Sequence, residues 1–178
     1  AVLSRNLHLA VMWKSDIINK RGGRHKQNKE IQKERCTMNI NWDAKGYKEN
    51  FSFVHEYGED VVSLLKSPKG AAVLDLGCGN GALSVKLLEK GYKVIGMDAS
   101  EAMLEIAKAQ YPHMTFLQGD ACSFHLKEPL DAIFSNAVFH WIDASMHPHM
   151  LCHLAGQLKT GGELVCEFGG NGCAETVH

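Results

Sequence analysis

Apolar residues follow two different rhythms along the chain from position 71 onward. Short continuous apolar runs, rich in Val, Ile and Leu, are typical of buried strands, whereas apolar residues recurring every three or four positions are typical of amphipathic helices. The two patterns alternate almost to the end of the chain. They predict strands at 71–76, 93–97, 114–118, 130–135 and 163–168, and helices at 82–90, 101–110 and 147–158.

This alternation predicts the fold class of the region 71–178. Strands separated by helices form parallel sheets, because a right-handed helical crossover is the common way to join two parallel neighbours. We therefore expect an α/β fold, a Rossmann-like parallel sheet with helices on both faces. The region 38–70 has a helical pattern that a Ser-Pro-Lys-Gly sequence ends, and it predicts one or two helices before the sheet.

Residues 1–37 differ from the rest of the chain in pattern and in charge. They lack a sustained apolar period and carry a net charge of +6, whereas the remainder carries −7. Three possibilities stay open: a basic arm for nucleic acid, a targeting peptide around residues 2–13, or upstream sequence read through a misplaced start. We favour the third, because Met38 opens the first orderly stretch, and we expect residues 1–37 to lie outside the fold.

Composition narrows the class of protein. The chain has 178 residues with 45% hydrophobic and 22% charged residues, as in ordinary globular domains, and no apolar run approaches the ~20 residues of a membrane helix. Six cysteines occur without a C-x-x-C pair, which favours the cytoplasm and argues against structural zinc. His147, His149 and His153 lack a carboxylate at a suitable spacing, so we expect no metal.

The first strand runs into a glycine-rich turn that is followed by a helix. Gly77, Gly79 and Gly81 allow the backbone to approach a ligand closely, and the helix that follows presents free N–H groups. Gly77, Gly79 and Ala82 also satisfy the dinucleotide fingerprint, with Asp98 ending the next strand. Asp75 stands just before the loop, however, and a carboxylate there suits an amino group better than a pyrophosphate.

The chain resembles the class I S-adenosylmethionine-dependent methyltransferases over roughly residues 38–168. Five motifs carry the resemblance, in the order and at the spacing of that family. They are VLDLGCGNG at 73–81, VIGMDASEAM at 94–103, FLQGDA at 116–121, FSNAVFHW at 134–141 and LKTGGELVCEF at 158–168.

The resemblance implies S-adenosylmethionine as the cofactor and assigns roles to several residues. Asp75 and the glycine loop would hold the methionine part, Asp98 the ribose hydroxyls, and Asp120 with the Ala121 N–H the adenine. His140 and Trp141 are candidates for the substrate pocket, or for aromatic core. The implied cofactor-binding residues are Asp75, Gly77, Cys78, Gly79, Asn80, Gly81, Asp98, Ala99, Met103, Asp120, Ala121 and Asn136.

Residues 136–141 and 167–170 are similar to the trans-aconitate methyltransferase group, which modifies small carboxylic acids. The resemblance thus implies O-methylation of a small-molecule acceptor, without nucleic acid, since the region after residue 37 is acidic. Members of the family continue with two more strands, so we expect the strand at 163–168 to form an exposed edge and the chain to be a truncated fragment. A cofactor-binding fragment without turnover and an NAD(P)-dependent oxidoreductase remain alternatives.

Overall fold

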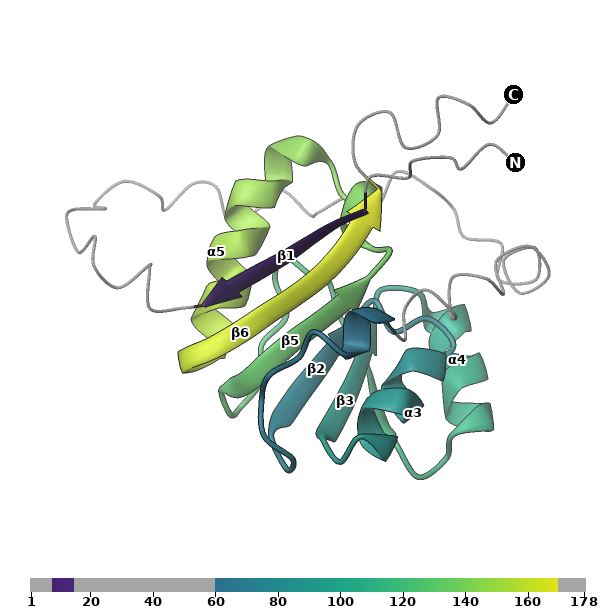
Figure 1. The fold of residues 1–178 in the computed structure, drawn as a ribbon. Helices are drawn as coiled ribbons and strands as arrows, with labels where there is room; N and C mark the ends of the chain where they lie inside the picture. Colours follow the sequence, from purple (N-terminus) through teal and green to yellow (C-terminus); the bar gives the residue numbers. More distant parts are fainter. Residues whose placement is uncertain (1–7, 15–59, 170–178) are drawn as a thin grey trace, which may run out of the picture.

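Six strands form one sheet in a computed structural model that describes residues 8–14 and 60–169 (Figure 1). The strand order is β1-β6-β5-β2-β3-β4, and β2 to β6 run parallel to one another. The strands are β1 (His8–Lys14), β2 (Ala72–Leu76), β3 (Lys93–Asp98), β4 (Thr115–Gln118), β5 (Leu130–Asn136) and β6 (Leu158–Gly169).

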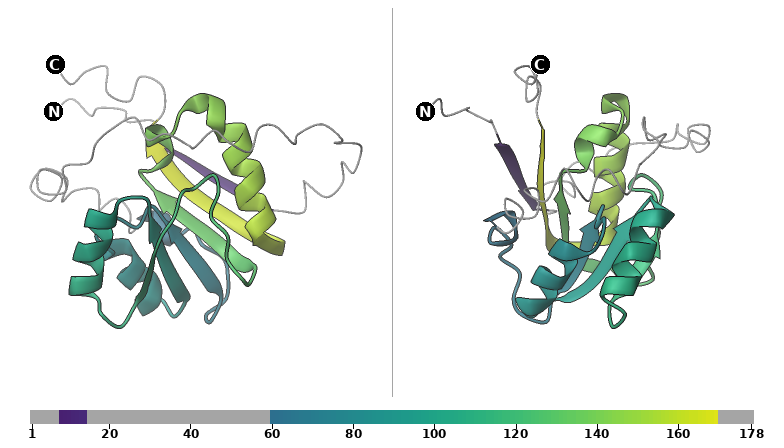
Figure 2. Two further views of the ribbon diagram at one scale, coloured as in Figure 1. Left: turned by 180° about the vertical axis from the view of Figure 1, so that it is seen from behind. Right: turned by 90° about the vertical axis from the view of Figure 1, so that its right-hand side faces the viewer.

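Three α-helices connect the parallel strands, α3 (Ala82–Glu89), α4 (Glu101–Gln110) and α5 (His147–Gln157), and two short 3-10 helices, η2 (Phe139–Trp141) and η3 (Ala144–Met146), precede α5. Figure 2 shows α3 and α5 on opposite faces of the sheet. The predicted fold class, a Rossmann-like parallel sheet with helices on both faces, is confirmed. No helix among the described residues has the length and apolarity needed to cross a membrane.

The edge of the sheet differs from the prediction. Residues 8–14, expected outside the fold, form β1, which pairs antiparallel with β6 from His8 opposite Gly169 to Lys14 opposite Glu163. The strand at the end of the chain is therefore not an exposed edge, and the prediction was wrong for these seven residues. Residues 9–13 are a short continuous apolar run, which periodicity alone cannot assign to a strand without its partner. The rest of the segment 1–37 lies outside the described residues.

Two other boundaries depart from the prediction. β6 begins at Leu158 rather than at residue 163, because it passes an irregularity in the pairing with β5 between Leu130 and Ala132. Of the helices predicted before the sheet, the described residues include only a short helical segment at 60–62. The remainder of that prediction lies outside the described residues.

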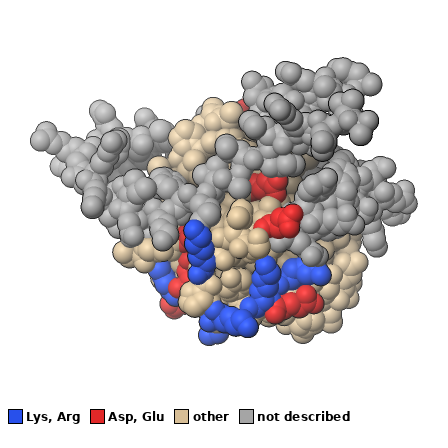
Figure 3. All heavy atoms as spheres, in the orientation of Figure 1, with Lys and Arg blue, Asp and Glu red and all other residues tan. Residues whose placement is uncertain are grey.

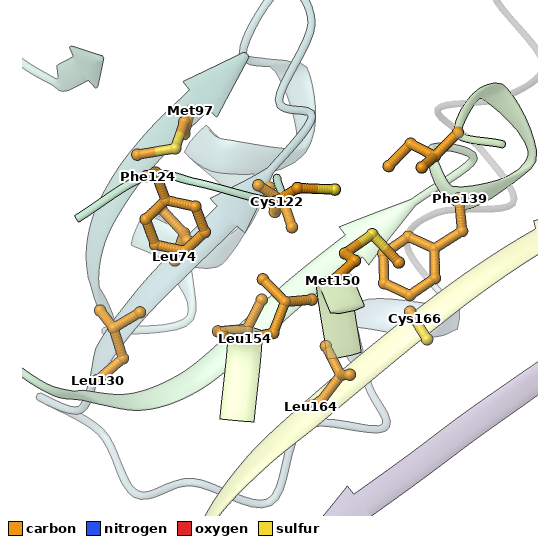
Figure 4. Packing of buried hydrophobic residues seen from close by; sticks show 13 residues of the cluster. Leu74, Met97, Cys122, Phe124, Leu130, Phe139, Met150, Leu154, Leu164 and Cys166 are labelled. Carbon is orange, nitrogen blue, oxygen red and sulfur yellow. The ribbon is translucent and has the colours of Figure 1, made fainter. Parts of the chain in front are cut away.

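Alternate residues of each strand supply two separate apolar layers. On one face, buried strand residues pack against Leu83 and Leu87 of α3. On the other face they pack against Met150 and Leu154 of α5 and against Phe124, as Figure 4 shows in close view. Fully buried Leu and Met side chains each contribute about 1.5–3 kcal/mol, so the helices are fixed against a rigid sheet.

The chain reverses direction across the sheet between β2 and β5. β3 and β4 extend the sheet on one side of β2, and β5 and β6 extend it on the other. The connections that leave the carboxyl ends of β2 and β5 therefore diverge and open a crevice. Ligands of open α/β sheets bind at such a switch point.

Candidate functional site

A pocket lies at this switch point. Its empty space is about 830 Å³ when the open mouth is included. It collects residues from the carboxyl ends of β2, β3, β4 and β5. The lining consists of Leu76, Gly77, Gly79, Met97, Asp98, Ala99, Met103, Gly119, Asp120, Ala121, Asn136, Ala137, Val138, Trp141 and Ile142.

The glycine loop forms the floor between β2 and α3. Gly77 and Gly79 have φ of 75° and 53°, and Gly81, which precedes α3, has φ of 82°, values that favour glycine. The N–H groups of Gly77 and Cys78 both donate to the Met97 carbonyl, at 2.7 and 3.0 Å. The loop is therefore tied to the end of β3 and keeps its open backbone shape.

Asp98, the last residue of β3, connects the loop with the start of α4. One carboxylate oxygen accepts from the Gly79 N–H and the other from the Ser100 N–H, both at 2.8 Å. Burial raises the pKa of Asp98, and these N–H groups act in the opposite direction by stabilising the charged form. The side chain is thus fixed in orientation while it lines the pocket.

The neighbouring end of β4 supplies a second carboxylate. Asp120 accepts from the Cys122 N–H at 2.7 Å, and its carbonyl accepts from the Ser123 and Phe124 N–H groups, both at 3.0 Å. This turn places Asp120 and Ala121 in the lining, close to Asp98 in the same pocket. Met103 is held across from them, because the Ser100 hydroxyl that caps α4 accepts from its N–H.

The segment after β5 closes the other side of the pocket. Ala137 has φ of 58°, the left-handed region, and is the one non-glycine residue with positive φ among the described residues. Val138 packs directly over Gly77, so that a methyl group on Gly77 would overlap the valine side chain. Trp141 and Ile142 continue the wall, which we name the η2 wall and define as residues 137–142.

The charges in the pocket have one sign. Within the described part of the chain, Asp98 and Asp120 are the charged lining residues, and no Lys, Arg or His joins them. Exposed lysines such as Lys69, Lys90 and Lys93 lie at the amino ends of β2 and β3, and Figure 3 shows blue side chains gathered at this lower end of the molecule. The pocket therefore favours a cationic ligand and disfavours a pyrophosphate.

Asp75 does not line the pocket. It is 2% exposed and accepts from the Ser84 hydroxyl of α3 at 2.5 Å, on the face of β2 opposite to Leu76. Burial raises its pKa to about 7, the hydrogen bond from Ser84 lowers it, and the nearby charge of Asp98 raises it further. The structure thus places Asp75 behind the glycine loop, and its predicted contact with the cofactor stays a prediction.

Four other residues of the predicted site lie outside the pocket lining. Cys78 packs with Leu104 and Phe116, and burial raises the pKa of its thiol, so it is a packing residue rather than a nucleophile. The Asn80 side chain accepts from the Ala82 N–H at 3.2 Å, and Gly81 precedes α3. His140 is exposed, and its Nδ1 accepts from the Gly169 N–H at 3.4 Å.

Six residues of the lining had no site role predicted from the sequence. Two of them, Leu76 and Met97, end buried strands, and their apolar character is equally typical of core. The others adjoin named residues, and only the fold decides which side chain turns inward. They are Gly119, Ala137, Val138 and Ile142.

No group of three or more potential metal ligands occurs among residues 60–169. His147, a candidate ligand by residue type alone, directs its Nε2 at two backbone carbonyl oxygens. His153 packs edge-on against Phe124, with ring centres 5.0 Å apart.

Comparison with known proteins identifies the family. Residues 73–162 match the model of a methyltransferase domain, and the chain belongs to that family. The match contains the glycine loop and both carboxylates of the pocket. The resemblance to class I methyltransferases is therefore confirmed, and the dinucleotide interpretation of the glycine loop is not supported.

Several curated proteins are similar over about three quarters of the chain. An uncharacterised methyltransferase of Schizosaccharomyces pombe is 33% identical over 141 residues, 76% of this chain and 54% of that protein. A malonyl-[acyl-carrier protein] O-methyltransferase of Ilyobacter polytropus is 33% identical (79% and 54%), and a trans-aconitate 2-methyltransferase of Yersinia pseudotuberculosis is 30% identical (73% and 50%). The chain spans about half the length of these relatives.

Solved structures agree with the assignment. A TehB-like SAM-dependent methyltransferase of Corynebacterium glutamicum is 25% identical with a TM-score of 0.62, covering 73% of this chain and 74% of that one. An S-adenosylmethionine dependent methyltransferase of Mesorhizobium loti is 28% identical with a TM-score of 0.55, covering 63% and 52%. Both are similar in fold and in sequence.

Proposed function

We propose that the protein is an S-adenosylmethionine-dependent methyltransferase that transfers a methyl group to a small-molecule acceptor, a carboxylic acid. One observation carries the proposal: Asp98 ends β3, Asp120 follows the neighbouring strand β4, and both line one pocket with the glycine loop. This arrangement offers hydrogen-bond acceptors for a nucleoside and open backbone for a chain beyond it. It is found in a chain whose family is that of methyltransferase domains.

The residues present fit this cofactor. The Asp98 carboxylate has about four lone-pair sites, of which the Gly79 and Ser100 N–H groups use two. The other two can accept from the ribose hydroxyls. We assign the adenine amino group to Asp120, the adenine ring to Ala99, Met103 and Ala121, and the methionine part to the glycine loop near Asn136.

The charge of the pocket agrees with this assignment. S-adenosylmethionine has a net charge of +1, from a sulfonium, an ammonium and a carboxylate group, which two carboxylates in the pocket attract, whereas the phosphates of a dinucleotide would be repelled. Asp98 alone would also suit the ribose of NAD, because an acidic residue at this place belongs to the dinucleotide fingerprint; the second carboxylate, Asp120, and the lack of a Lys, Arg or His among the described lining residues weigh against NAD(P).

When bound, the cofactor would supply a methyl group on a positively charged sulfur. A nucleophile that attacks the methyl carbon in line displaces the sulfur as its leaving group. The chain must then orient the two reactants and exclude water. Val138, Trp141 and Ile142 offer apolar surface on the side of the pocket away from Asp98. A carboxylate acceptor is already ionised at neutral pH, so the transfer to it needs no general base.

The acceptor class is supported by similarity to proteins that are named for trans-aconitate and for malonyl-[acyl-carrier protein]. Formation of S-adenosylhomocysteine, measured with a panel of small mono-, di- and tricarboxylic acids, tests it. Turnover with one of the acids supports the proposal. Binding of S-adenosylhomocysteine without turnover favours a cofactor-binding fragment, because the chain spans half of its relatives, and binding of NADH instead would favour an oxidoreductase.

A further inference from the structure

We propose that His147 is a positioning residue that holds the η2 wall against the glycine loop and so sets the shape of the pocket beyond the ribose. The inference rests on the proposed function, in that the pocket must be the cofactor site. His147 is the first residue of α5 and lies outside the pocket lining. It acts through the backbone of the wall rather than on a ligand.

The imidazole makes two contacts with the wall. Its Nε2 atom lies 3.0 Å from the Phe139 carbonyl oxygen and 3.2 Å from the Ile142 carbonyl oxygen. Carbonyl oxygens only accept hydrogen bonds, so Nε2 carries the hydrogen and is shared between them. The Phe139 carbonyl also accepts from the Ile142 N–H within the turn, at 3.1 Å, and His147 supplies a second donor from another helix, which it shares with the Ile142 carbonyl.

The start of the wall has an uncommon backbone conformation and its own hydrogen bonds. Ala137 holds a left-handed φ of 58°, which a residue with a Cβ adopts only when its surroundings impose it. Its N–H donates to the Glu167 carbonyl at 2.7 Å, and its carbonyl accepts from the Trp141 indole at 3.1 Å. These bonds fix the start of the wall, and His147 fixes its end.

The buried centre of the wall makes an apolar contact with β6. Phe139 is 3% exposed and stacks on Phe168, with ring centres 5.3 Å apart. That apolar contact fixes the depth of the turn, but it does not fix the rotation that turns Trp141 and Ile142 toward the pocket. Within the turn the Trp141 and Ile142 N–H groups donate to the Val138 and Phe139 carbonyls, at 2.9 and 3.1 Å, and His147 adds a directional contact from another helix.

The position of the wall decides which part of the cofactor it affects. Val138 lies on Gly77, whereas Asp98 and Asp120 line the ends of β3 and β4. A nucleoside held by the two carboxylates would extend its sulfur and amino-acid chain toward the wall. Loss of His147 should therefore weaken ligands that have this chain more than ligands that lack it.

The test compares two ligands on the full 178-residue chain. S-adenosylhomocysteine has the amino-acid chain, and methylthioadenosine keeps the adenosine and the sulfur without it. By titration calorimetry, His147→Leu is expected to weaken S-adenosylhomocysteine about tenfold, the effect of one net hydrogen bond, and methylthioadenosine less than about twofold. General damage to the fold would weaken both ligands equally, and that outcome overturns the inference.

Conservative variants separate positioning from packing. The Nε2 of a glutamine can reach the place of the imidazole Nε2, so His147→Gln should restore the affinity to within about twofold, whereas the shorter His147→Asn should not. His149→Leu, at an exposed position on the same helix, is the matched control and should change neither affinity. If His147→Leu does not fold, His147→Asn carries the same expectation.

Nitrogen-correlated NMR of the free protein tests the geometry without a ligand. The Nε2–H tautomer of His147 is expected, and the Nδ1–H tautomer would overturn the inference, as would full affinity for S-adenosylhomocysteine in both the leucine and asparagine variants. A wild-type chain that binds neither ligand would refute the proposed cofactor site instead, and the inference with it. The two failures are therefore distinguishable.

Discussion

Replacing Asp98 by alanine removes the group on which the proposed cofactor site most depends. Its carboxylate accepts from Gly79 and Ser100 and has two acceptor sites left for the ribose. A hydrogen bond to a charged group contributes about 1.5–3 kcal/mol, and water that enters the vacated space returns part of that. We therefore expect Asp98→Ala to weaken S-adenosylhomocysteine by about 2–4 kcal/mol, roughly 30- to 900-fold in Kd.

Titration calorimetry over a series of pH values measures this loss. Burial raises the pKa of Asp98, so the affinity of the wild type should fall as the pH is lowered, whereas that of the alanine variant should not follow the same course. Asp98→Asn keeps the size of the side chain, but an amide has only one oxygen that accepts. The loss of binding free energy for S-adenosylhomocysteine should therefore be about half that of Asp98→Ala.

Asp131→Asn is the matched control. Asp131 also accepts from a backbone N–H, that of Ala72 at 2.8 Å, and it lies on β5 at the end of the sheet away from the pocket. Its substitution should leave the affinity unchanged. An Asp98→Ala variant whose affinity stays within twofold of the wild type would refute the assignment of this carboxylate to the ribose.

Three other substitutions test how the sequence stabilises the site. Burial raises the pKa of Asp75 to about 7, so the folded protein keeps this carboxyl protonated while the unfolded chain ionises, and its contribution to stability falls as the pH rises from about 4 to 7. Asp75→Asn should flatten that dependence and raise the free energy of unfolding at pH 8 by at most about 4 kcal/mol. Urea unfolding of the variant at several pH values that gives the same change of stability with pH as the wild type would contradict this. Glu163→Ala removes the acceptor of two backbone N–H groups before β2 and should lower the free energy of unfolding by about 2–4 kcal/mol, whereas an unchanged urea midpoint would show that water replaces it. Gly77→Ala should weaken S-adenosylhomocysteine by about tenfold or more, because φ is 75° and the methyl group would overlap Val138; adding Val138→Ala should recover part of the loss, and no recovery would mean that backbone strain alone is responsible.

The sequence predicted the elements whose local signals agree with the final fold. The helix at Glu101–Gln110 was predicted to the residue, because Ser100 caps its start and its apolar positions follow the helical period. β1 could not be predicted in this way, since its seven residues become a strand through pairing with β6. The early start of β6 was not predicted, because Gly161 and Gly162 separate residues 158–160 from the apolar run that follows.

The site was predictable where chemistry, rather than packing, selects the residue. A positive φ selects glycine, and the open carboxyl end of a strand accommodates a carboxylate. The residues predicted in this way that line the pocket are Gly77, Gly79, Asp98 and Asp120. Asp75 does not, because neighbouring side chains of a strand point to opposite faces and Leu76 takes the side of the pocket. The same periodicity could have separated the two residues in advance.

The η2 wall was beyond prediction for a different reason. Its shape depends on the left-handed Ala137, on the bond from Trp141 to the Ala137 carbonyl and on His147 eight residues after Phe139. Each of these contacts requires the backbone to be in place first. The sequence could name His140 and Trp141 as candidates, but not that the tryptophan lines the pocket while the histidine is exposed.

Calorimetric titration of the chain with S-adenosylhomocysteine, with NADH in parallel, tests the central claim most directly. Two carboxylates and no cation among the described lining residues predict binding of S-adenosylhomocysteine and none of NADH. Binding of NADH, or of neither ligand, would contradict the claim that this pocket is a methyltransferase cofactor site.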